Sequence, residues 1–144
     1  MKQKKQLLAG ILQLNLLIVV MSSCTSQPKD MTVENNMIFA QQQLQFAFDE
    51  IEYARTNEST ESRKKREEKG WGELANPRNT EPDGSLHLVT SRDWTSGFFP
   101  GELWYMYEYT QNNFWKKKAQ VHTNMLEQEK TNGGTHDMGF KMYC

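Results

Sequence analysis

Cysteine is scarce in this 144-residue chain, which carries only Cys24 and Cys144. Two cysteines allow at most one disulfide, so a disulfide framework is excluded. The chain also lacks an excess of charge of either sign, because its 17 Lys and Arg nearly balance its 18 Asp and Glu, which gives a formal net charge of −1. The chain therefore has no long-range field that would favour nucleic acid or an acidic membrane surface. A binder of polyanions would need a local basic site.

Several motifs that carry enzyme chemistry are missing from the sequence. There is no Gly-rich phosphate loop, no GxSxG nucleophile elbow, and no HxxxH or CxxC pair that could begin a metal site. His136 and Asp137 are adjacent, but two neighbouring ligands diverge and cannot hold a metal by themselves. The sequence therefore predicts no metal and no cofactor.

The longest mostly apolar stretch, residues 7–21, is interrupted only by Gly10, Gln13 and Asn15; it follows a basic head and precedes Ser22-Ser23-Cys24. The run is short for a membrane span and typical of a secretory signal. Small residues ahead of a cysteine resemble a bacterial lipobox, in which the thiol is lipidated and the chain is cut just before it. We therefore expect a lipoprotein signal peptide at 1–23 and an exported protein, periplasmic or at the cell surface, that is anchored to a membrane through Cys24.

The rest of the chain divides into a short polar tether, residues 24–31, and one domain, residues 32–144. Spacings of three and four predict a first helix from about Thr32 to Arg55. Its apolar stripe consists of Met37, Ala40, Leu44, Ala47, Ile51 and Ala54. Three further rings widen the stripe and predict burial on more than one side of the helix, namely Phe39, Phe46 and Phe48.

Two more helices are predicted in the second half of the chain. Pro100 suits the first turn of a helix that continues to about Tyr109. Asn112 or Asn113 can cap the next helix, which we expect to continue to Gly133-Gly134. Strand alternation is absent apart from a weak "SLHLVT", so the predicted fold class is mostly α.

Between the first and second helices the sequence is polar. Residues 56–69 contain no apolar side chain and predict a solvated helix end or loop. Residues 70–97 are rich in Trp, Arg, Asn and Asp, with a turn at Pro82-Asp83-Gly84. This long segment predicts either a binding surface or an ordered connection stabilised by its own side chains.

Asp137 stands between a double glycine and a predicted short helix, residues 138–143. One interpretation makes its carboxylate the N-cap of that helix. The other makes it a catalytic carboxylate, because a histidine beside a carboxylate, here His136, can orient it or share a proton. The two roles are compatible.

Trp94 differs from the other aromatic residues of the second half. Rings at helical spacing usually belong to the core, and we expect Trp104, Tyr107 and Trp115 there. Trp94 instead ends a loop, beside Arg92 and a carboxylate. An indole with polar neighbours commonly stacks on a sugar ring. Trp94 is therefore a candidate substrate-binding residue.

Two stretches, "PRNTEPDGSLHLVTSRDWTSGFFPGELWYMYEYT" and "NGGTHDMGF", closely resemble the N-terminal part of the unsaturated glucuronyl hydrolases, glycoside hydrolase family 88. The resemblance runs from about Trp71 to Cys144. It implies part of an α/α toroid, a six-hairpin barrel with its active site at one open end. It also implies substrates made by polysaccharide lyases: oligosaccharides, among them glycosaminoglycan fragments, that end in an unsaturated uronic acid.

The implied chemistry is hydration of the ring double bond, after which the resulting hemiketal opens and expels the remaining sugar. By the resemblance, Asp137 is a catalytic carboxylate, Trp94 packs against the unsaturated sugar, and His136 belongs to the same motif. The proton-donating aspartate of the family has no counterpart in this chain. We therefore expect a truncated N-terminal part that is inactive alone.

Two alternatives remain. An unsaturated rhamnogalacturonyl hydrolase would share the toroid and the His-Asp motif, although the wording "DWTSGFFPG" favours the glucuronyl type. A non-enzymatic sugar-binding lipoprotein would account for the missing donor carboxylate. The expected partners under the main interpretation are unsaturated uronic-acid oligosaccharides and a membrane, and not nucleic acid.

Overall fold

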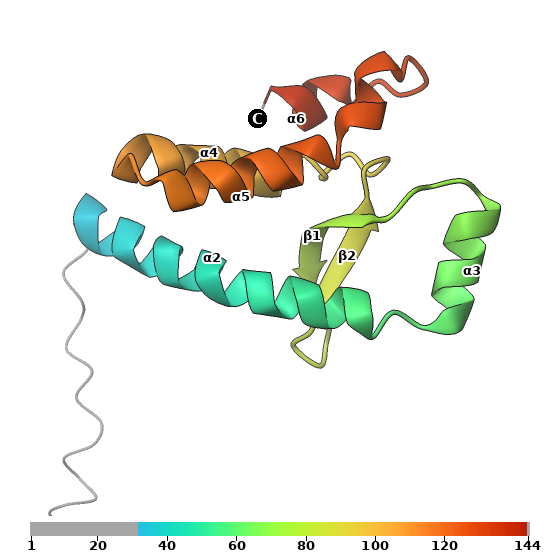
Figure 1. Cartoon of the computed structure of the whole chain (residues 1–144), viewed down its shortest axis with the longest axis horizontal. Coiled ribbons are helices and arrows are strands. Elements are labelled where there is room, and N and C mark those ends of the chain that lie inside the picture. The colour runs from blue at the N-terminus through green and yellow to red at the C-terminus, as the bar shows by residue number, and fades with distance from the viewer. Residues whose placement is uncertain (1–31, 144) are drawn as a thin grey trace, which may run out of the picture. The chain divides into compact units, whose positions relative to one another are not determined.

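The computed structural model describes residues 32–143 (Figure 1). The predicted signal peptide 1–23, the lipidation site Cys24 and the tether 24–31 lie outside the described residues. The chain divides into two compact units, Met1–Asn35 and Asn36–Cys144. The second unit carries both motifs.

The described elements are mostly helical, as predicted. They follow one another as α2 (Val33–Thr56), α3 (Thr60–Glu68), β1 (Leu74–Thr80), β2 (Leu86–Thr90), α4 (Phe98–Thr110), α5 (Asn113–Asn124), the 3-10 helix η1 (Glu127–Thr131) and α6 (Met138–Met142). The pairing of α4 with α5 is consistent with the predicted part of an α/α barrel. Within residues 32–143, no helix has both the length and the apolar character that a membrane crossing requires.

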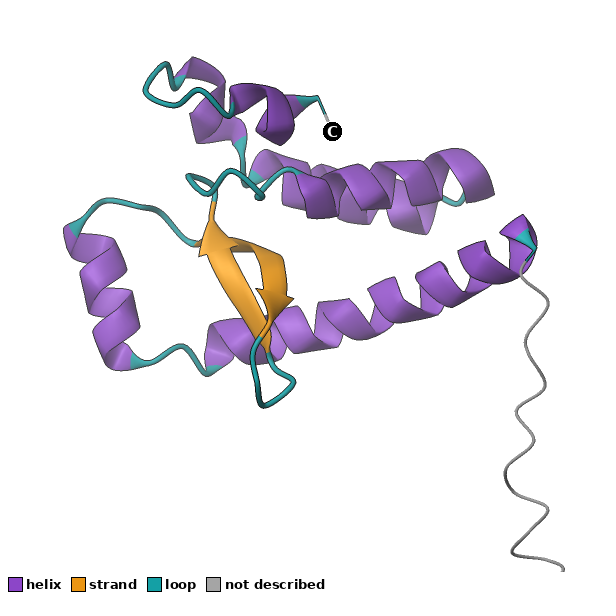
Figure 2. Cartoon of the chain, turned by 180° about the vertical axis from the view of Figure 1, so that it is seen from behind, coloured by secondary structure: helices purple, strands orange, loops and turns teal. Residues whose placement is uncertain are grey.

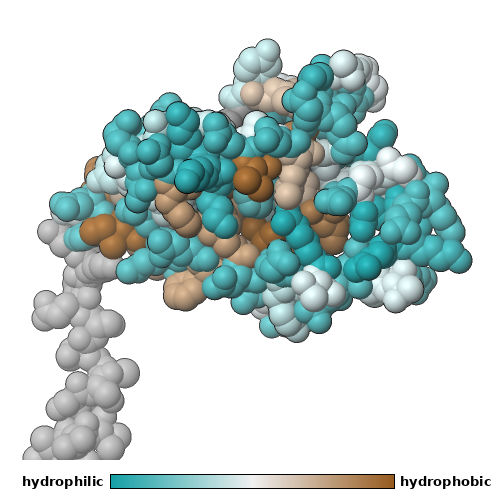
Figure 3. Space-filling view, viewed as in Figure 1, coloured by the Kyte–Doolittle hydropathy of each residue, from teal (hydrophilic) through white to brown (hydrophobic). Residues whose placement is uncertain are grey.

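The predicted stripe of α2 forms one side of the core. Ile51 is buried, and the other five stripe residues are partly buried against the same cluster. The prediction of burial on more than one side is wrong, because Phe39 and Phe46 are 54% and 67% exposed. Only Phe48 among the three extra rings packs inward, edge-on to Phe99 and tilted against Trp115. Figure 3 shows apolar side chains as a broken band between α2 and the α4–α5 pair.

The other side of the core comes from α4 and α5. Trp115 is 1% exposed, and Trp104 and Tyr107 pack partly buried against the cluster, as predicted. Asn112 caps α5 by accepting a hydrogen bond from the Phe114 N–H at 2.9 Å. The helix ends earlier than predicted, at Asn124.

The early end of α5 follows from a change in backbone hydrogen bonding. The Leu126 N–H donates to the Thr123 carbonyl, and the Glu129 N–H donates to the Leu126 carbonyl. These bonds span three residues and build 3-10 turns, which include η1. Leu126 and Glu129, which these turns connect, are both buried.

The segment predicted as a long loop contains a β-hairpin (Figure 2). β1 and β2 pair antiparallel, with register shifts between Leu74 and Asn76 and between Pro77 and Asn79. These irregularities and Pro77 break the alternation by which a strand is recognised in sequence. The predicted turn is confirmed, because Gly84 has a φ of +91° and its N–H donates to the Glu81 carbonyl.

α3 is the solvated helix that the charged segment allows. None of its residues is buried, and Ser59 caps it by accepting a hydrogen bond from the Ser62 N–H. Arg55, near the end of α2, donates to the carbonyls of Leu74 and Ala75. This contact fixes the start of β1 against α2.

Candidate functional site

Trp94 lies in the segment that joins β2 to α4, residues 91–97, here called the motif loop. The indole is 43% exposed. Its ring is edge-on to Phe98 at 5.7 Å between centroids and to Phe140 at 6.0 Å. Phe140 belongs to α6, so Trp94 contacts the helix that follows the His-Asp motif. The exposed part of the ring remains available for stacking.

The motif loop is fixed by hydrogen bonds of its own. The Asp93 carboxylate accepts from the Thr95 N–H at 2.9 Å and from the Thr95 hydroxyl at 2.7 Å. Arg78 of β1 pairs with the same carboxylate at 2.8 Å. The Ser96 hydroxyl donates to the Ser91 carbonyl at 2.9 Å. Trp94 is therefore held on a rigid turn between two ordered neighbours.

A second polar contact attaches the motif loop to the core. The buried Asn76 side chain donates to the Ser96 carbonyl at 2.7 Å and lies 2.7 Å from the Nδ1 atom of His122. Burial lowers the pKa of His122 to about 4, with further lowering by Arg55 and Lys118. At neutral pH the ring is uncharged, so a partner that cannot ionise suits it.

α6 approaches the motif loop at Gly97. A Cβ atom on this residue would lie 2.0 Å from the Lys141 carbonyl oxygen, well inside contact distance. Only glycine fits there. The glycine after the tryptophan and serine of the first motif therefore serves the docking of the second motif.

Buried charges hold the same junction. The Lys141 ammonium is fully buried and donates to the Arg92 carbonyl at 2.8 Å and to the Glu129 carboxylate at 3.0 Å. Glu129, 3% exposed, also accepts from the Ser91 hydroxyl at 2.9 Å and from Asn132 at 2.7 Å. The network joins the motif loop, η1 and α6, and leaves neither charge without a partner.

The Glu129 carboxyl is stabilised in its ionised form. Burial alone would raise its pKa, but the hydrogen bonds from Asn132, Lys141 and Ser91 together lower it below its usual value. The Lys141 ammonium therefore keeps Glu129 as its counter-ion at neutral pH. Among residues 32–143, no buried side-chain nitrogen or oxygen lacks a hydrogen-bond partner.

Asp137 directly precedes α6, but the cap prediction is wrong in its detail. The side chain makes no capping hydrogen bond, and the backbone carbonyl accepts instead, from the Phe140 and Lys141 N–H groups. The carboxylate lies 3.3 Å from the Nε2 atom of His136, whose side chain is 94% exposed. A carboxylate that is not used as a cap is available for chemistry.

The structure thus brings the two motifs together, through Trp94 on Phe140 and Gly97 on Lys141. Asp137 and Trp94 are linked by α6, and His136 lies beside Asp137 at the surface. In the described part of the chain, no group of three or more His, Cys, Asp or Glu residues could hold a metal ion.

No motif or spacing in the sequence predicts the residues that support this junction, which are Asn76, Ser91, Ser96, Glu129 and Lys141. The signal for Lys141 was a single charge among the apolar residues of "MGFKMYC". No comparable signal marked Glu129, because the helix was predicted to continue through it.

No family model matches the chain. Curated relatives include the unsaturated glucuronyl hydrolase of Formosa agariphila, 56% identical over 59 residues, which are 41% of this chain and 15% of the relative. The unsaturated chondroitin disaccharide hydrolase of Streptococcus pneumoniae is 35% identical over 63 residues, 40% of this chain and 15% of the relative. The chain thus spans about 15% of the length of these curated relatives.

A solved structure, described as an unsaturated glucuronyl hydrolase specific for heparin, is 44% identical with a TM-score of 0.47. The match covers 49% of this chain and 19% of the solved one. The sequence matches to the curated relatives confirm the resemblance over part of the chain.

Proposed function

We propose that this chain, a relative of the unsaturated glucuronyl hydrolases over part of its length, supplies one wall of the active site of a hydrolase. The substrates would be oligosaccharides that end in an unsaturated glucuronic acid, as glycosaminoglycan lyases produce. The observation that carries the proposal is the junction of the two motifs, in which Trp94 and the helix entered at Asp137 share one interface.

Trp94 would provide the platform for the unsaturated ring. Its indole makes T-shaped contacts with Phe98 and Phe140, and the residue is 43% exposed. The apolar C–H groups of a sugar match an aromatic face, so stacking orients the ring double bond. Orientation of this kind lowers the barrier before any proton moves.

Asp137 would act as a carboxylate beside the reacting double bond. A carboxylic acid elsewhere in the active site protonates one carbon of the bond, and water adds to the other carbon, next to the ring oxygen. Positive character develops there in the transition state, and the Asp137 charge would stabilise it. His136, 3.3 Å from Asp137, would orient that carboxylate.

The resemblance assigns the proton donor to no residue of this chain, so we propose that turnover needs a carboxylic acid supplied from elsewhere. The full chain alone should bind an unsaturated disaccharide but should not consume its double bond. The loss of ultraviolet absorbance that follows hydration is a direct assay of that consumption.

The test is a chimera in which residues 71–144 of this chain, which contain Trp94 and Asp137, replace their equivalent in the Formosa agariphila hydrolase. At 56% identity the exchange is conservative, and the recipient supplies the missing groups. We expect the chimera to hydrate unsaturated disaccharides. Asp137→Asn in the chimera should lower kcat by about 10² or more, the loss typical of one group that stabilises transition-state charge.

Asp83→Asn is the matched control, since this carboxylate lies in the hairpin turn and accepts hydrogen bonds from the N–H and hydroxyl of Ser85. It should leave kcat within about twofold of the chimera, as expected for a surface site. Near-unchanged turnover of a folded Asp137→Asn chimera would refute the catalytic role. A chimera that folds but never turns over would refute the assignment of this segment to the active site.

We also propose that the chain is exported and membrane-anchored through a lipid on Cys24. The support is the sequence alone, a basic head and an apolar run that end in Ser22-Ser23-Cys24. Fatty acid labelling in a bacterial host should mark the wild-type chain and not Cys24→Ala. Equal labelling of both would contradict the anchor.

A further inference from the structure

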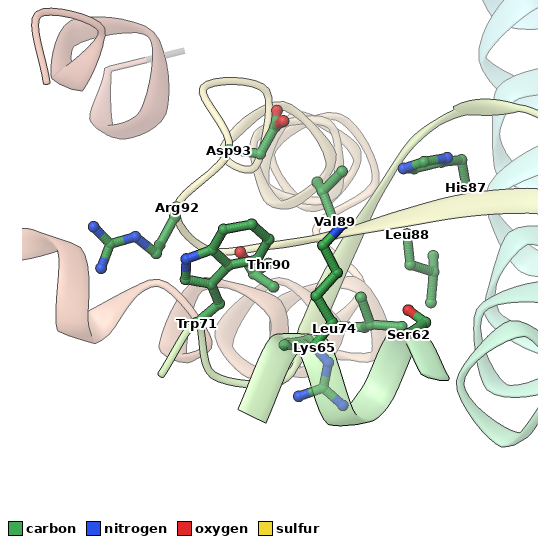
Figure 4. A pocket seen from close by; sticks show the side chains of 11 residues that line it. Ser62, Lys65, Trp71, Leu74, His87, Leu88, Val89, Thr90, Arg92 and Asp93 are labelled. Atoms are coloured by element: carbon green, nitrogen blue, oxygen red, sulfur yellow. The ribbon is translucent and has the colours of Figure 1, made fainter. Parts of the chain in front are cut away.

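A cavity of about 620 Å³ lies on the side of the motif loop away from α6 (Figure 4). Its walls come from α3, from Trp71, from β2 and from the first residues of the motif loop. Lys65, Trp71 and Arg92 are among the side chains that line it.

The cavity carries positive charge that the protein itself does not neutralise. Asp93 at its rim is paired with Arg78, and Arg66 is paired with Glu58 at 2.8 Å. Lys65 and Arg92 also line the cavity, and their side chains have no hydrogen bond or ion pair among residues 32–143. Two unneutralised cations in one cavity stand out in a chain whose net charge is −1.

An aromatic face accompanies these cations. Trp71 is 37% exposed, and Figure 4 shows its indole beside the Arg92 side chain. The Lys69 ammonium lies 4.3 Å from the centroid of the Trp71 ring, which adds a third cation close by. An aromatic ring flanked by cations suits a ligand with both an apolar ring face and an anionic group.

The cavity is distinct from the candidate active site. Arg92 and Asp93 line it, but the next residue, Trp94, turns to the other side and packs on Phe140. The Arg92 carbonyl accepts from Lys141, so its side chain is presented from a fixed backbone. The motif loop therefore contributes Arg92 and Asp93 to the cavity and Trp94 to the candidate active site.

We propose that this cavity binds an acidic sugar unit whose ring lies on Trp71 and whose sulfate or carboxylate groups reach Lys65 on one side of the indole and Arg92 on the other. The choice of a saccharide over another anion rests on the proposed function, because the same loop carries the sugar platform Trp94. The cavity would hold an acidic sugar that is not the one hydrated, and it would favour charged over neutral oligosaccharides.

The test is a titration of the full chain, followed by the NMR signals of the Trp71 and Trp94 indole N–H groups. The probe is a sulfated chondroitin-type disaccharide whose uronic acid is saturated, so that it lacks the reactive double bond. The Trp71 signal should shift in a saturable manner. Lys65→Ala with Arg92→Ala should weaken this binding by about tenfold or more, as expected for the loss of two charge-assisted contacts.

The matched control is Lys64→Ala with Lys117→Ala, which removes the same charge from exposed residues that do not line the cavity. It should change the affinity by less than about twofold, since surface charges are screened by salt. Equal weakening by the two double variants would overturn the proposal, because it would show a general charge effect. Absence of a saturable Trp71 shift would overturn it as well.

An unsaturated disaccharide separates this proposal from the proposed function. A response of Trp94 to that probe, with none of Trp71 to the saturated one, would leave the proposed function standing and remove the cavity site. A response of Trp71 without one of Trp94 would do the reverse, since the cavity would then bind acidic sugars apart from any active site.

Discussion

The apolar core and the junction of the two motifs are held together by different forces. In the core, Phe48, Phe99 and Trp115 pack ring against ring between α2, α4 and α5. At the junction, α6 is held by the buried Lys141 ammonium, by its close approach to Gly97 and by one ring contact at the surface, Phe140 on Trp94. Phe140, Met142 and Tyr143 of the same segment are exposed.

The apolar core mainly stabilises the fold, whereas the polar contacts of the junction mainly fix the position of α6. Apolar contacts are tolerant of small shifts, because dispersion and the hydrophobic effect have little directionality. Hydrogen bonds to a buried ammonium fix distances and angles, and they are costly to leave unmade. A segment held in the second way keeps its geometry with few apolar side chains, which suits a helix that begins at a candidate catalytic carboxylate.

The largest expected effect is that of Lys141→Met. Removal of one partner from a buried ion pair typically costs about 3–5 kcal/mol, because the other charge stays buried and unpaired. Here Glu129 would lose its ammonium and the Arg92 carbonyl its donor. We expect α6 to lose its protection from hydrogen exchange while the amides of α5 keep theirs.

Lys130→Met is the control for this experiment. Lys130 pairs with Glu127 on the surface nearby, and both side chains are well exposed. Such pairs contribute about 0–1 kcal/mol, so α6 should remain protected. Unchanged protection in Lys141→Met would show that the buried pair does not hold α6.

The next largest effect is expected for the pH dependence of stability, which His122 should set in mild acid. His122 has a pKa of about 4 in the folded protein, against about 6.5 in an unfolded chain. Between pH 4 and 6.5 the unfolded state binds more protons than the folded state. The contribution of His122 to the free energy of unfolding is therefore fully present above pH 6.5 and is lost as the pH drops toward 4. The shift corresponds to about 3 kcal/mol at most.

His122→Gln removes this ionisation while a side-chain amide remains for Asn76. Chemical denaturation at several pH values should give a flatter profile between pH 6.5 and 4 for the variant than for the wild type. Parallel profiles would show that His122 does not set the acid sensitivity.

A smaller effect is expected from Gly97→Ala. The added Cβ would lie 2.0 Å from the Lys141 carbonyl, so α6 must move away from the motif loop. Overpacking of this kind costs about 1–3 kcal/mol. Nuclear Overhauser contacts between Trp94 and Phe140 should weaken, whereas Gly133→Ala, at a site with open space around it, should preserve them. Intact ring contacts in Gly97→Ala would argue against the close approach.

The core could be predicted from sequence because its information is periodic. The stripe from Met37 to Ala54 repeats at helical spacing, and the structure places all of it against one cluster. The junction could not be predicted in this way. Glu129 and Lys141 meet only because α5 ends at Asn124 and 3-10 turns reorient the chain. β1 could not be predicted either, because Pro77 and the irregular pairing break the alternation of side chains that identifies a strand.

At the candidate site, too, some features could be predicted from the sequence and others could not. Trp94 and Asp137 were predicted from motifs, and their local surroundings are now described, but their roles in chemistry stay predictions. The capping role of the Asp137 side chain was wrong, because the backbone carbonyl of the same residue takes the two N–H groups. Composition and spacing gave no warning of this, since Asp is a favourable residue at either kind of helix start.

The central claim is that the motif loop and α6 form one unit, and hydrogen exchange tests it most directly. The Phe98 N–H bonds the Thr95 carbonyl, and the Lys141 N–H bonds the Asp137 carbonyl. The account predicts that these two amides open with the same free energy in the wild type and that Ser91→Ala, which removes one donor to Glu129, lowers both by about 1 kcal/mol. A Lys141 amide that exchanges freely while the Phe98 amide stays protected, in wild type and variant alike, would contradict it.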